Sequence, residues 1–256
     1  MPGDTNNGAD VFVRDRVTGT TLVSLTRTGA QAAVGSDSSA ISTDGRYVAL
    51  VSSGDNVVVG DTNNADDVFV RARTAGTTTL VSASRTGDSA DAESSGAAIS
   101  ADGRYVGFSS PATNLVAGDT NGTYDVFLRD LLAGTTSRVS VRSDGAQGNA
   151  LSGFNPGLSA DARYIAFTSN ASNLVSGDTN GTGDTFVRDR VAGTTTRVSV
   201  SGTGAQANAR STHAAISAGG QYVVFESLAS NLVAGDTKRH LRRIRTQPPG
   251  SASPTG

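Results

Sequence analysis

Cysteine is absent from this sequence, and proline, histidine and aromatic residues are scarce. The 256 residues include no Cys, 6 Pro, 2 His and 5% aromatic residues. The lack of cysteine excludes disulfides, thiolate nucleophiles and cysteine-ligated zinc. No apolar run is long enough to span a membrane, and the first ten residues have neither the basic region nor the apolar core of a signal peptide. Net charge is -2, so no overall field is expected to attract nucleic acid.

Groups suited to catalysis are equally sparse. A serine hydrolase needs a histidine base, and only His213 and His240 are present. Neither a Gly-x-Ser-x-Gly motif nor a glycine-rich phosphate loop leading into a helix occurs. His213 lies just before an expected strand, where an ordinary polar role is the stronger interpretation. We therefore predict that this chain has no catalytic site and is not an enzyme.

The dominant feature that is present is an internal repeat. The triplet Gly-Asp-Thr begins at Gly3, Gly60, Gly118, Gly177 and Gly235, at spacings of 57, 58, 59 and 58 residues. Such regular self-similarity predicts stacked supersecondary units that bury their apolar faces against one another. We predict one repeat array over residues 1–234, with repeats that start at residues 3, 60, 118 and 177.

Each repeat holds four short strand signals and no sustained helical periodicity. The first is DVFVRD or a close variant, and the second alternates polar and β-branched residues, as in TTTRVSV at residues 194–200. The third is a short segment such as AAIS, and the fourth is RYVAL or a variant. Glycine-containing turns join the first to the second and the third to the fourth. Four antiparallel strands per repeat predict an all-β β-propeller of about four blade equivalents, either a closed four-bladed ring or a fragment of a larger propeller.

The phrases SADGRYVGFSS, SADARYIAFTS and DVFLRD resemble the WD40-like β-propeller repeats of the TolB type. In that family a Ser-x-Asp-Gly turn precedes an apolar strand; here Ala or Thr stands where the family usually has Pro. The resemblance covers residues 3–234. It implies a bacterial protein outside the cytoplasm, secreted or periplasmic, and it favours a fragment because such propellers commonly have more blades.

The Gly-Asp-Thr phrase also carries a candidate metal site. An Asp, an Asn and a second Asp stand at relative positions 1, 3 and 7, and oxygen ligands at this spacing suit weakly bound calcium, with Gly122 and Gly181 allowing the sharp turn. An EF-hand loop would also need an oxygen side chain at position 5 and a Glu at 12, which these loops lack. The alternative is a structural turn in which Asp and Asn bind the backbone. The candidate ligands are Asp4, Asn6, Asp10, Asp61, Asn63, Asp67, Asp119, Asn121, Asp125, Asp178, Asn180 and Asp184.

The repeat pattern stops after Thr237. We predict that residues 235–256, which include a basic run, form an irregular, disordered tail. A second hypothesis concerns the origin of this tail. Degenerate codons for Lys238 to Gln247, read one base later, permit Asn-Gly-Thr-Ser-Asp-Val-Phe-Val-Arg, the next copy of the repeat. We therefore expect the tail to arise from a one-base shift within a longer repeat gene.

The extra length of each repeat predicts the functional surface. A period near 58 exceeds the WD40 blade of about 40 to 45 residues and places the surplus in two extended loops. We expect a non-catalytic propeller that binds a protein or other extracellular ligand through these loops, with calcium stiffening them. The alternatives are an accessory propeller of a prolyl-oligopeptidase-like hydrolase and a structural array without a ligand. Open blade edges would also allow self-association.

Overall fold

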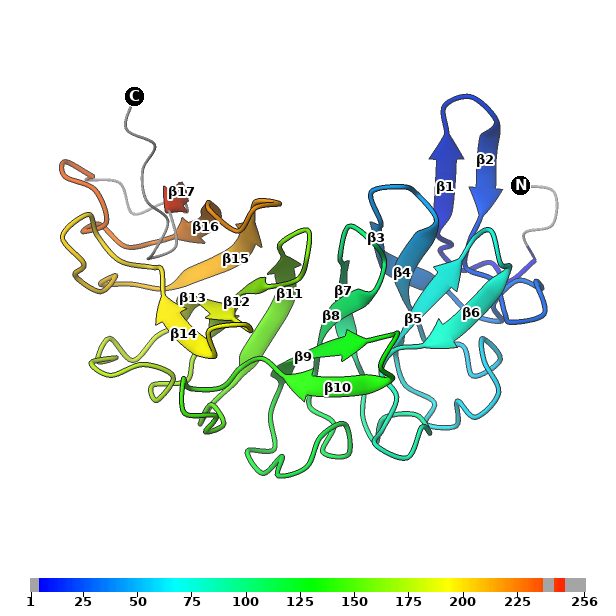
Figure 1. Cartoon of the computed structure of the whole chain (residues 1–256), viewed down its shortest axis with the longest axis horizontal. Helices are drawn as coiled ribbons and strands as arrows, with labels where there is room; N and C mark the ends of the chain where they lie inside the picture. Colours follow the sequence, from blue (N-terminus) through cyan, green and yellow to red (C-terminus); the bar gives the residue numbers. More distant parts are fainter. Residues whose placement is uncertain (1–4, 237–241, 247–256) are drawn as a thin grey trace. The chain divides into compact units, whose positions relative to one another are not determined.

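The computed structural model describes residues 5–236 and 242–246, and all regular elements in these ranges are β-strands (Figure 1). The strands form separate antiparallel sheets in which neighbours along the chain are neighbours in space. No helix in these ranges is long and apolar enough to cross a membrane. The prediction of an all-β chain built of four-stranded antiparallel sheets is confirmed.

The chain divides into two compact units. Unit 1 comprises Met1–Gly122 and Phe127–Ser137, and unit 2 comprises Thr123–Val126 and Arg138–Gly256. The division crosses strands β9 (Asp125–Asp130) and β10 (Thr135–Arg138), so the start of β9 and the last residue of β10 belong to unit 2 and the rest of their sheet to unit 1. Each unit is described by itself below.

Unit 1 contains a two-stranded hairpin followed by two four-stranded sheets. The hairpin pairs β1 (Phe12–Asp15) with β2 (Gly19–Leu22). The next sheet runs in chain order through β3 (Ser36–Ile41), β4 (Tyr47–Ser52), β5 (Asp67–Ala72) and β6 (Thr77–Leu80). The third sheet contains β7 (Ser95–Ile99), β8 (Tyr105–Ser110), β9 (Asp125–Asp130) and β10 (Thr135–Arg138).

Unit 2 repeats this arrangement. Its four-stranded sheet contains β11 (Ser152–Leu158), β12 (Tyr164–Ser169), β13 (Asp184–Asp189) and β14 (Thr194–Arg197). Its last sheet contains β15 (Ser211–Ile216), β16 (Val223–Ser227) and β17 (Arg242–Thr246).

The sheets are offset from the Gly-Asp-Thr repeat by half a repeat. Each four-stranded sheet begins with the third strand signal of one repeat and ends with the second strand signal of the next. Strand β5, for example, starts at Asp67 at the end of an acidic loop and pairs with β4 from Tyr47↔Ala72 to Ser52↔Asp67. The structure thus contains a leading hairpin and three complete four-stranded sheets among the described residues. Ring closure stays a prediction.

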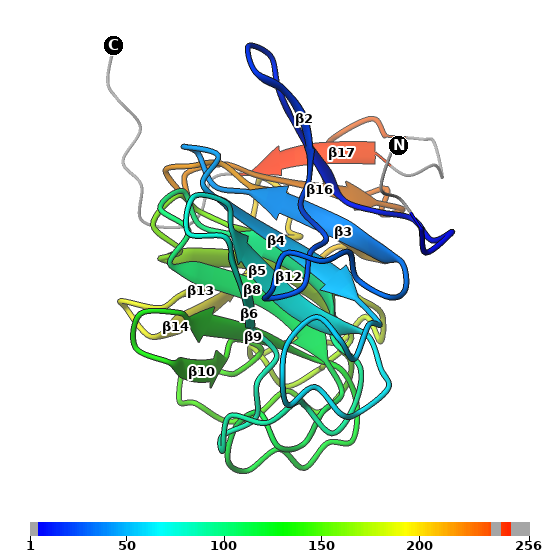
Figure 2. The ribbon, with the colours of Figure 1, turned by 90° about the vertical axis from the view of Figure 1, so that its right-hand side faces the viewer.

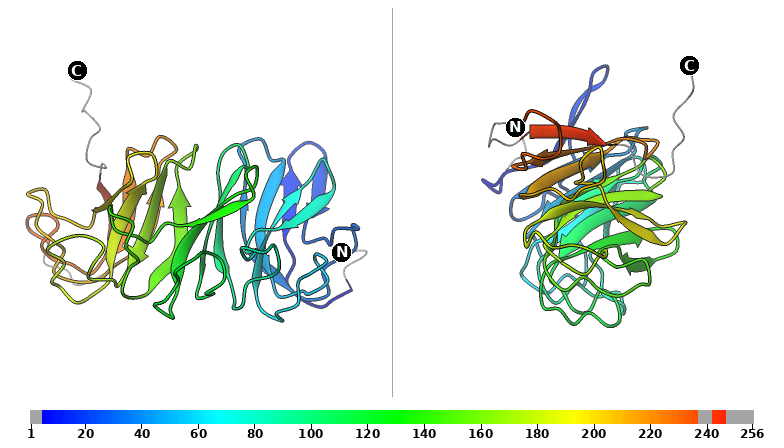
Figure 3. Two further views of the ribbon diagram at one scale, coloured as in Figure 1. Left: turned by 60° about the horizontal axis from the view of Figure 1, so that its bottom comes forward. Right: turned by 90° about the vertical axis from the view of Figure 1, so that its left-hand side faces the viewer.

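Within each unit the sheets pack face to face (Figures 2 and 3). In unit 1 one apolar cluster joins Val51 and Val70 of one sheet to Phe108 and Phe127 of the next. Strand β4 is buried along most of its length because its alternate side chains enter clusters on both faces of the sheet. In unit 2 Val187 and Phe225 belong to one such shared cluster. Burying each of these side chains contributes about 1.5–3 kcal/mol.

A glycine turn sets how closely successive sheets of unit 1 approach. Ser100 Oγ donates to Asp102 Oδ1 over 2.6 Å and accepts a hydrogen bond from Tyr105 N, which closes the turn before β8. Gly103 in this turn has φ +77°, and a Cβ there would lie 2.2 Å from Cδ2 of Tyr47 in the preceding sheet. Glycine is therefore needed both for its backbone angle and for the close approach of the tyrosine ring.

The basic tail is partly ordered, which corrects the prediction of an irregular segment for residues 242–246. Strand β17 pairs with β16, with Arg242 opposite Ser227 and Ile244 opposite Phe225. The physical reason is that β16 offers an unpaired row of backbone groups, which any extended segment can complete. Asp184 and Phe186 hold the same positions opposite Ser169 and Phe167 in the preceding sheet. The origin of the tail in a shifted reading frame stays a prediction, and residues 237–241 and 247–256 lie outside the described ranges.

Candidate functional site

Three of the acidic loops connect the second strand of a four-stranded sheet to its third strand, and the remaining one precedes β1. We call residues 60–67 the second acidic loop and residues 177–184 the fourth acidic loop, after their repeats; the first acidic loop comprises residues 3–10 and the third residues 118–125. The middle residue of each turn is left-handed, with φ 52° at Asn64 and 64° at Gly181. Glycine and asparagine are the residues that adopt this angle at least cost. The predicted sharp turn is thus present, including at Gly122, where φ is 63°.

The asparagine serves the turn in the first, second and fourth acidic loops. In the second acidic loop Asn63 Oδ1 accepts a hydrogen bond from Ala65 N over 3.0 Å, and its Nδ2 donates to Asp67 Oδ2 over 2.8 Å. Asn180 makes the equivalent bonds to Thr182 N and Asp184. Asn6 Oδ1 likewise accepts from Gly8 N. Because these amide oxygens already bind the backbone, the carboxylates are what remains of the predicted side-chain ligands for a cation.

The second aspartate of the loop is fully buried at the start of a strand. Asp67 Oδ1 accepts a hydrogen bond from Ser82 Oγ, and that hydroxyl in turn accepts from Val68 N over 3.0 Å. Ser199 holds Asp184 in the same way in the fourth acidic loop. Burial raises the pKa of both carboxyl groups, although these hydrogen bonds oppose the shift.

In the fourth acidic loop, two side chains from outside the loop compensate the paired carboxylates. Gln206 Nε2 donates to Asp178 Oδ1 over 2.8 Å and to Asp184 Oδ2 over 2.9 Å. Arg197 Nη1 lies 3.6 Å from Asp178 Oδ1 and 3.7 Å from Asp184 Oδ2. A guanidinium and a carboxamide thus share the space between two nearly buried acids, as buried charges require.

The second acidic loop lacks both compensating groups. Leu80 pairs with Phe69 as Arg197 pairs with Phe186, and Ser89 occupies the bridge position of Gln206. Ser89 Oγ accepts a hydrogen bond from Thr62 N, as Gln206 Oε1 does from Thr179 N, so only the backbone contact is preserved. Leucine has no donor, and no hydrogen bond joins the Ser89 hydroxyl to Asp61.

Asp61 is the residue most affected by this loss. Its side chain is buried, with 5% of the residue exposed, and neither carboxylate oxygen has a hydrogen-bond partner among the described residues. The backbone N–H of Asn63 and the Asp67 carboxyl are near enough to influence the pKa of Asp61, but neither forms a hydrogen bond of normal geometry with it. Burial, followed by the charges of Asp67 and Asp55, raises the pKa of Asp61 to about 7.

The predicted ligands of the first and third acidic loops have other surroundings. Asp10 accepts hydrogen bonds from Ser24 Oγ and Gln31 Nε2, so its carboxylate is compensated within the hairpin region. Asp125 accepts from Ser140 Oγ and Gln147 Nε2, with Arg138 Nε 3.4 Å away. Asp119 and Asn121 belong to unit 1 and Asp125 to unit 2. Asp4 lies outside the described residues.

The sequence reasoning missed the residues that distinguish the loops. Arg138 and Arg197 occupy the end of the second strand signal, where Leu22 and Leu80 stand in the other repeats. Gln31, Gln147 and Gln206 likewise share a position with Ser89. Aligning the repeats shows both differences, but their meaning appears only when β-pairing brings these positions next to the acids.

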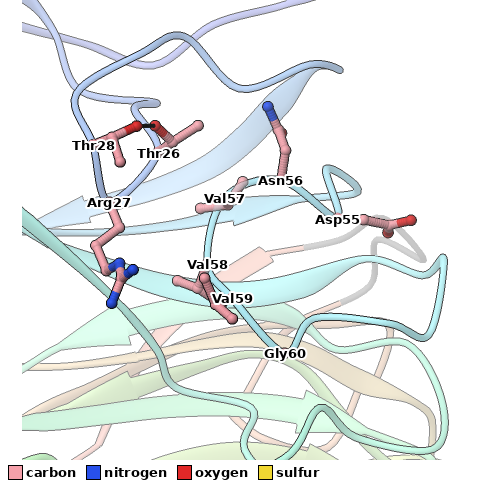
Figure 4. Close-up of a pocket in the computed structure, with 9 residues that line it drawn as sticks. All are labelled: Thr26, Arg27, Thr28, Asp55, Asn56, Val57, Val58, Val59 and Gly60. Carbon is pink, nitrogen blue, oxygen red and sulfur yellow. Dashed lines mark hydrogen bonds between the residues drawn. The ribbon is translucent and has the colours of Figure 1, made fainter.

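A second feature is a groove formed by two loops of unit 1. Thr26, Arg27 and Thr28 form one side and residues 55–60 the other, enclosing about 310 Å³ of open space. Figure 4 shows the Arg27 side chain extending toward Val58 and Val59. An equivalent groove of about 280 Å³ is lined by Arg85 and residues 115–117 of the next repeat. Both grooves are formed by the same two recurring loops, and the second is lined in addition by Arg129 and residues 134–136.

Hydrogen bonds hold the loops in place. The Asn56 side chain accepts from Ala33 N over 2.9 Å, and Asn114 accepts from Asp91 N over 3.1 Å. Backbone bonds from Arg27 N to Val57 O and from Arg85 N to Asn114 O connect the two sides of each groove. The side chains of Val57 and Leu115 are buried and anchor the loops to the core.

Comparison with known proteins identifies the fold. No model of a known protein family matches the chain, and no curated protein matches it. Among solved structures, a putative TolB from Agrobacterium tumefaciens matches with 16% identity and a TM-score of 0.55, over 87% of this chain and 64% of that one. TolB from Acinetobacter baumannii matches with 15% identity and a TM-score of 0.49, over 85% of this chain and 42% of that one.

A prolyl endopeptidase structure also matches, with 12% identity and a TM-score of 0.50, over 84% of this chain and 28% of that one. The chain therefore spans less than two thirds of each of these proteins. At such low identities the likeness concerns the fold alone. The fold is a TolB-like β-propeller, as the repeat phrases predict.

Proposed function

We propose that this chain is a non-catalytic β-propeller module that binds a protein through its repeated loops, with calcium stabilising an acidic loop. The observation that carries the proposal is the groove that recurs in successive repeats of unit 1. A surface that is built twice from the same loops, each held by an asparagine side chain that accepts a backbone hydrogen bond, is preorganised, and preorganisation lowers the entropic cost of binding. The resemblance to TolB supports a bacterial protein that works outside the cytoplasm.

The chemistry of the groove favours a protein segment. Val59 is 82% exposed beside Arg27, so an apolar side chain and a cationic group face the same space. Exposed apolar residues next to arginine are typical of protein-binding surfaces. The partner segment should therefore present an apolar residue next to an acidic one.

The test uses a photo-activated cross-linking residue at one of two exposed positions of unit 1. Val59 lies in the groove, whereas Val17, which is 93% exposed, lies in the turn between β1 and β2 and lines neither groove. Cross-linking in an extract of the source cells should give a discrete adduct from position 59 and none from position 17, and mass spectrometry would identify the partner. Equal labelling from both positions would contradict binding at the groove.

A second candidate function is an accessory propeller of a prolyl-oligopeptidase-like hydrolase. The prolyl endopeptidase match, over 28% of that chain, favours it. This alternative predicts that the full-length gene encodes a Gly-x-Ser-x-Gly motif in a separate catalytic domain. Sequencing the gene on both sides of this segment distinguishes the two functions.

A further inference from the structure

We propose that the second acidic loop is a cation site for calcium, formed around Asp61 and Asp67, and that the fourth acidic loop binds none. The inference rests on the calcium part of the proposed function and is independent of the groove. It restricts calcium to one loop, although the sequence pattern treats all four alike.

The first reason to expect a cation is that the carboxylate oxygens of Asp61 lack hydrogen-bond partners among the described residues. Both carboxylate oxygens of Asp61 are buried and without a hydrogen-bond partner among the described residues, and the carboxyl group of Asp67 in the same loop is also buried. Buried carboxylates are normally paired with a cation or bound to a metal. The protein side chains around Asp61 supply no such partner, because Leu80 and Ser89 stand where a guanidinium and a carboxamide could have reached it.

The fourth acidic loop shows what the second one lacks. It has the same turn, the same Asn–Asp hydrogen bond and the same serine, yet Arg197 lies within 4 Å of both carboxylates. In the fourth acidic loop, the residue paired with Phe186 is thus an arginine that brings a positive charge to the two acids. A metal ion would perform in the second acidic loop the task that Arg197 performs in the fourth.

The donor chemistry selects the ion. Asp61 offers two oxygens and Asp67 shares its Oδ2 with Asn63, so every available ligand is an oxygen and soft metals are disfavoured. Calcium accepts irregular oxygen shells completed by carbonyls and water, whereas magnesium demands near-octahedral geometry and keeps its own waters. Because the Asp61 oxygens are buried, a small ion can reach them but the side chain of a partner protein cannot.

The experiment compares two matched variants of the full chain. Thermal unfolding is followed at pH 7.5 in chelator, in calcium and in magnesium for the wild type, Asp61→Asn and Asp178→Asn. Wild type should gain roughly 5 °C in Tm when free calcium exceeds Kd by about 100-fold, and less in magnesium. Asp61→Asn should lose this gain, whereas Asp178→Asn should keep it. Asp61→Asn is expected to fold because it removes an unpaired buried charge.

Titration calorimetry gives an independent reading and should show one calcium per chain for wild type and Asp178→Asn, and none for Asp61→Asn. A calcium response that survives Asp61→Asn but disappears in Asp178→Asn would overturn this inference while leaving calcium in the proposed function. If wild type shows no response to calcium, calcium is removed both from this inference and from the proposed function. The cross-linking result at Val59 decides the binding surface separately.

Discussion

The second and fourth acidic loops have nearly the same sequence and the same backbone turn, but opposite electrostatic situations. In the fourth loop, Arg197 and Gln206 sit between Asp178 and Asp184. In the second loop, the equivalent acids face Leu80 and Ser89, and Asp61 has no hydrogen-bond partner among the described residues. The comparison teaches that a loop motif does not define a site. The side chains that strand pairing brings to it determine whether its charges are already satisfied.

Removing the arginine should have the largest effect. Arg197→Leu makes the fourth loop resemble the second, and we expect the free energy of unfolding to fall by about 2–3 kcal/mol because two buried carboxylates lose their cation. Urea denaturation measures this change. The exposed Arg16→Leu is the matched control, expected to stay within about 0.5 kcal/mol of wild type. Equal effects of the two variants would show that Arg197 does not compensate the acids.

The pH dependence should distinguish the loops next. Folding raises the pKa of Asp61 from 3.8 to about 7. Between these values the folded chain keeps a proton that the unfolded chain has lost, so the free energy of unfolding should decrease as pH rises from about 4 to 7. In chelator, the free energy of unfolding of wild type should fall by at least about 1 kcal/mol more than that of Asp61→Asn between pH 4 and pH 7. Parallel stability curves for the two proteins would argue against a strained carboxyl at Asp61.

The reciprocal change should convert the second loop into a copy of the fourth. Leu80→Arg is expected to raise the free energy of unfolding in chelator by about 1 kcal/mol, since a guanidinium would lie near Asp61 and Asp67 as Arg197 lies near Asp178 and Asp184. It should also abolish the gain in Tm with calcium. Leu80→Met keeps the apolar volume and should retain the calcium response. If Leu80→Arg still responds to calcium, the guanidinium and the ion do not share a position.

The smallest effect tests whether the difference is confined to the loops. Arg104 binds Asp130 at 2.7 Å and Arg163 binds Asp189 at 2.8 Å, in equivalent, partly exposed turns of the two units. Arg104→Ala and Arg163→Ala should each lower the free energy of unfolding by less than about 1 kcal/mol, and the two decreases should be equal. Chemical denaturation of both variants provides the measurement. Clearly unequal costs would mean that the repeats differ elsewhere too.

Much of the fold can be predicted from local patterns. The Gly-Asp-Thr period, the apolar fourth strand signal and the Ser-x-Asp-Gly turn predict four-stranded sheets because each reflects short-range chemistry within one repeat. The same reasoning predicts the acidic turn and the role of Gly181. It did not predict strand β17, because the basic tail has no strand pattern of its own and pairs only where β16 leaves an edge open.

The candidate site was only half predictable for a related reason. Asp61 and Asp67 belong to one phrase, so their proximity follows from the turn. Leu80 and Ser89 come from later segments, and their influence depends on the register that sets Leu80 opposite Phe69 and joins Ala83 to Ser89. A search for ligands within the motif therefore finds the acids in every repeat, but misses what satisfies them.

The amino-acid sequence by itself determined the repeat, the strands, the turns and the acids that each loop carries, since these depend on residues close together along the chain. The tertiary structure alone decided which acids are compensated, because that depends on side chains that meet only after the strands have paired. Arg197 reaches Asp178 across the folded sheet, and Leu80 has no group with which to do the same for Asp61.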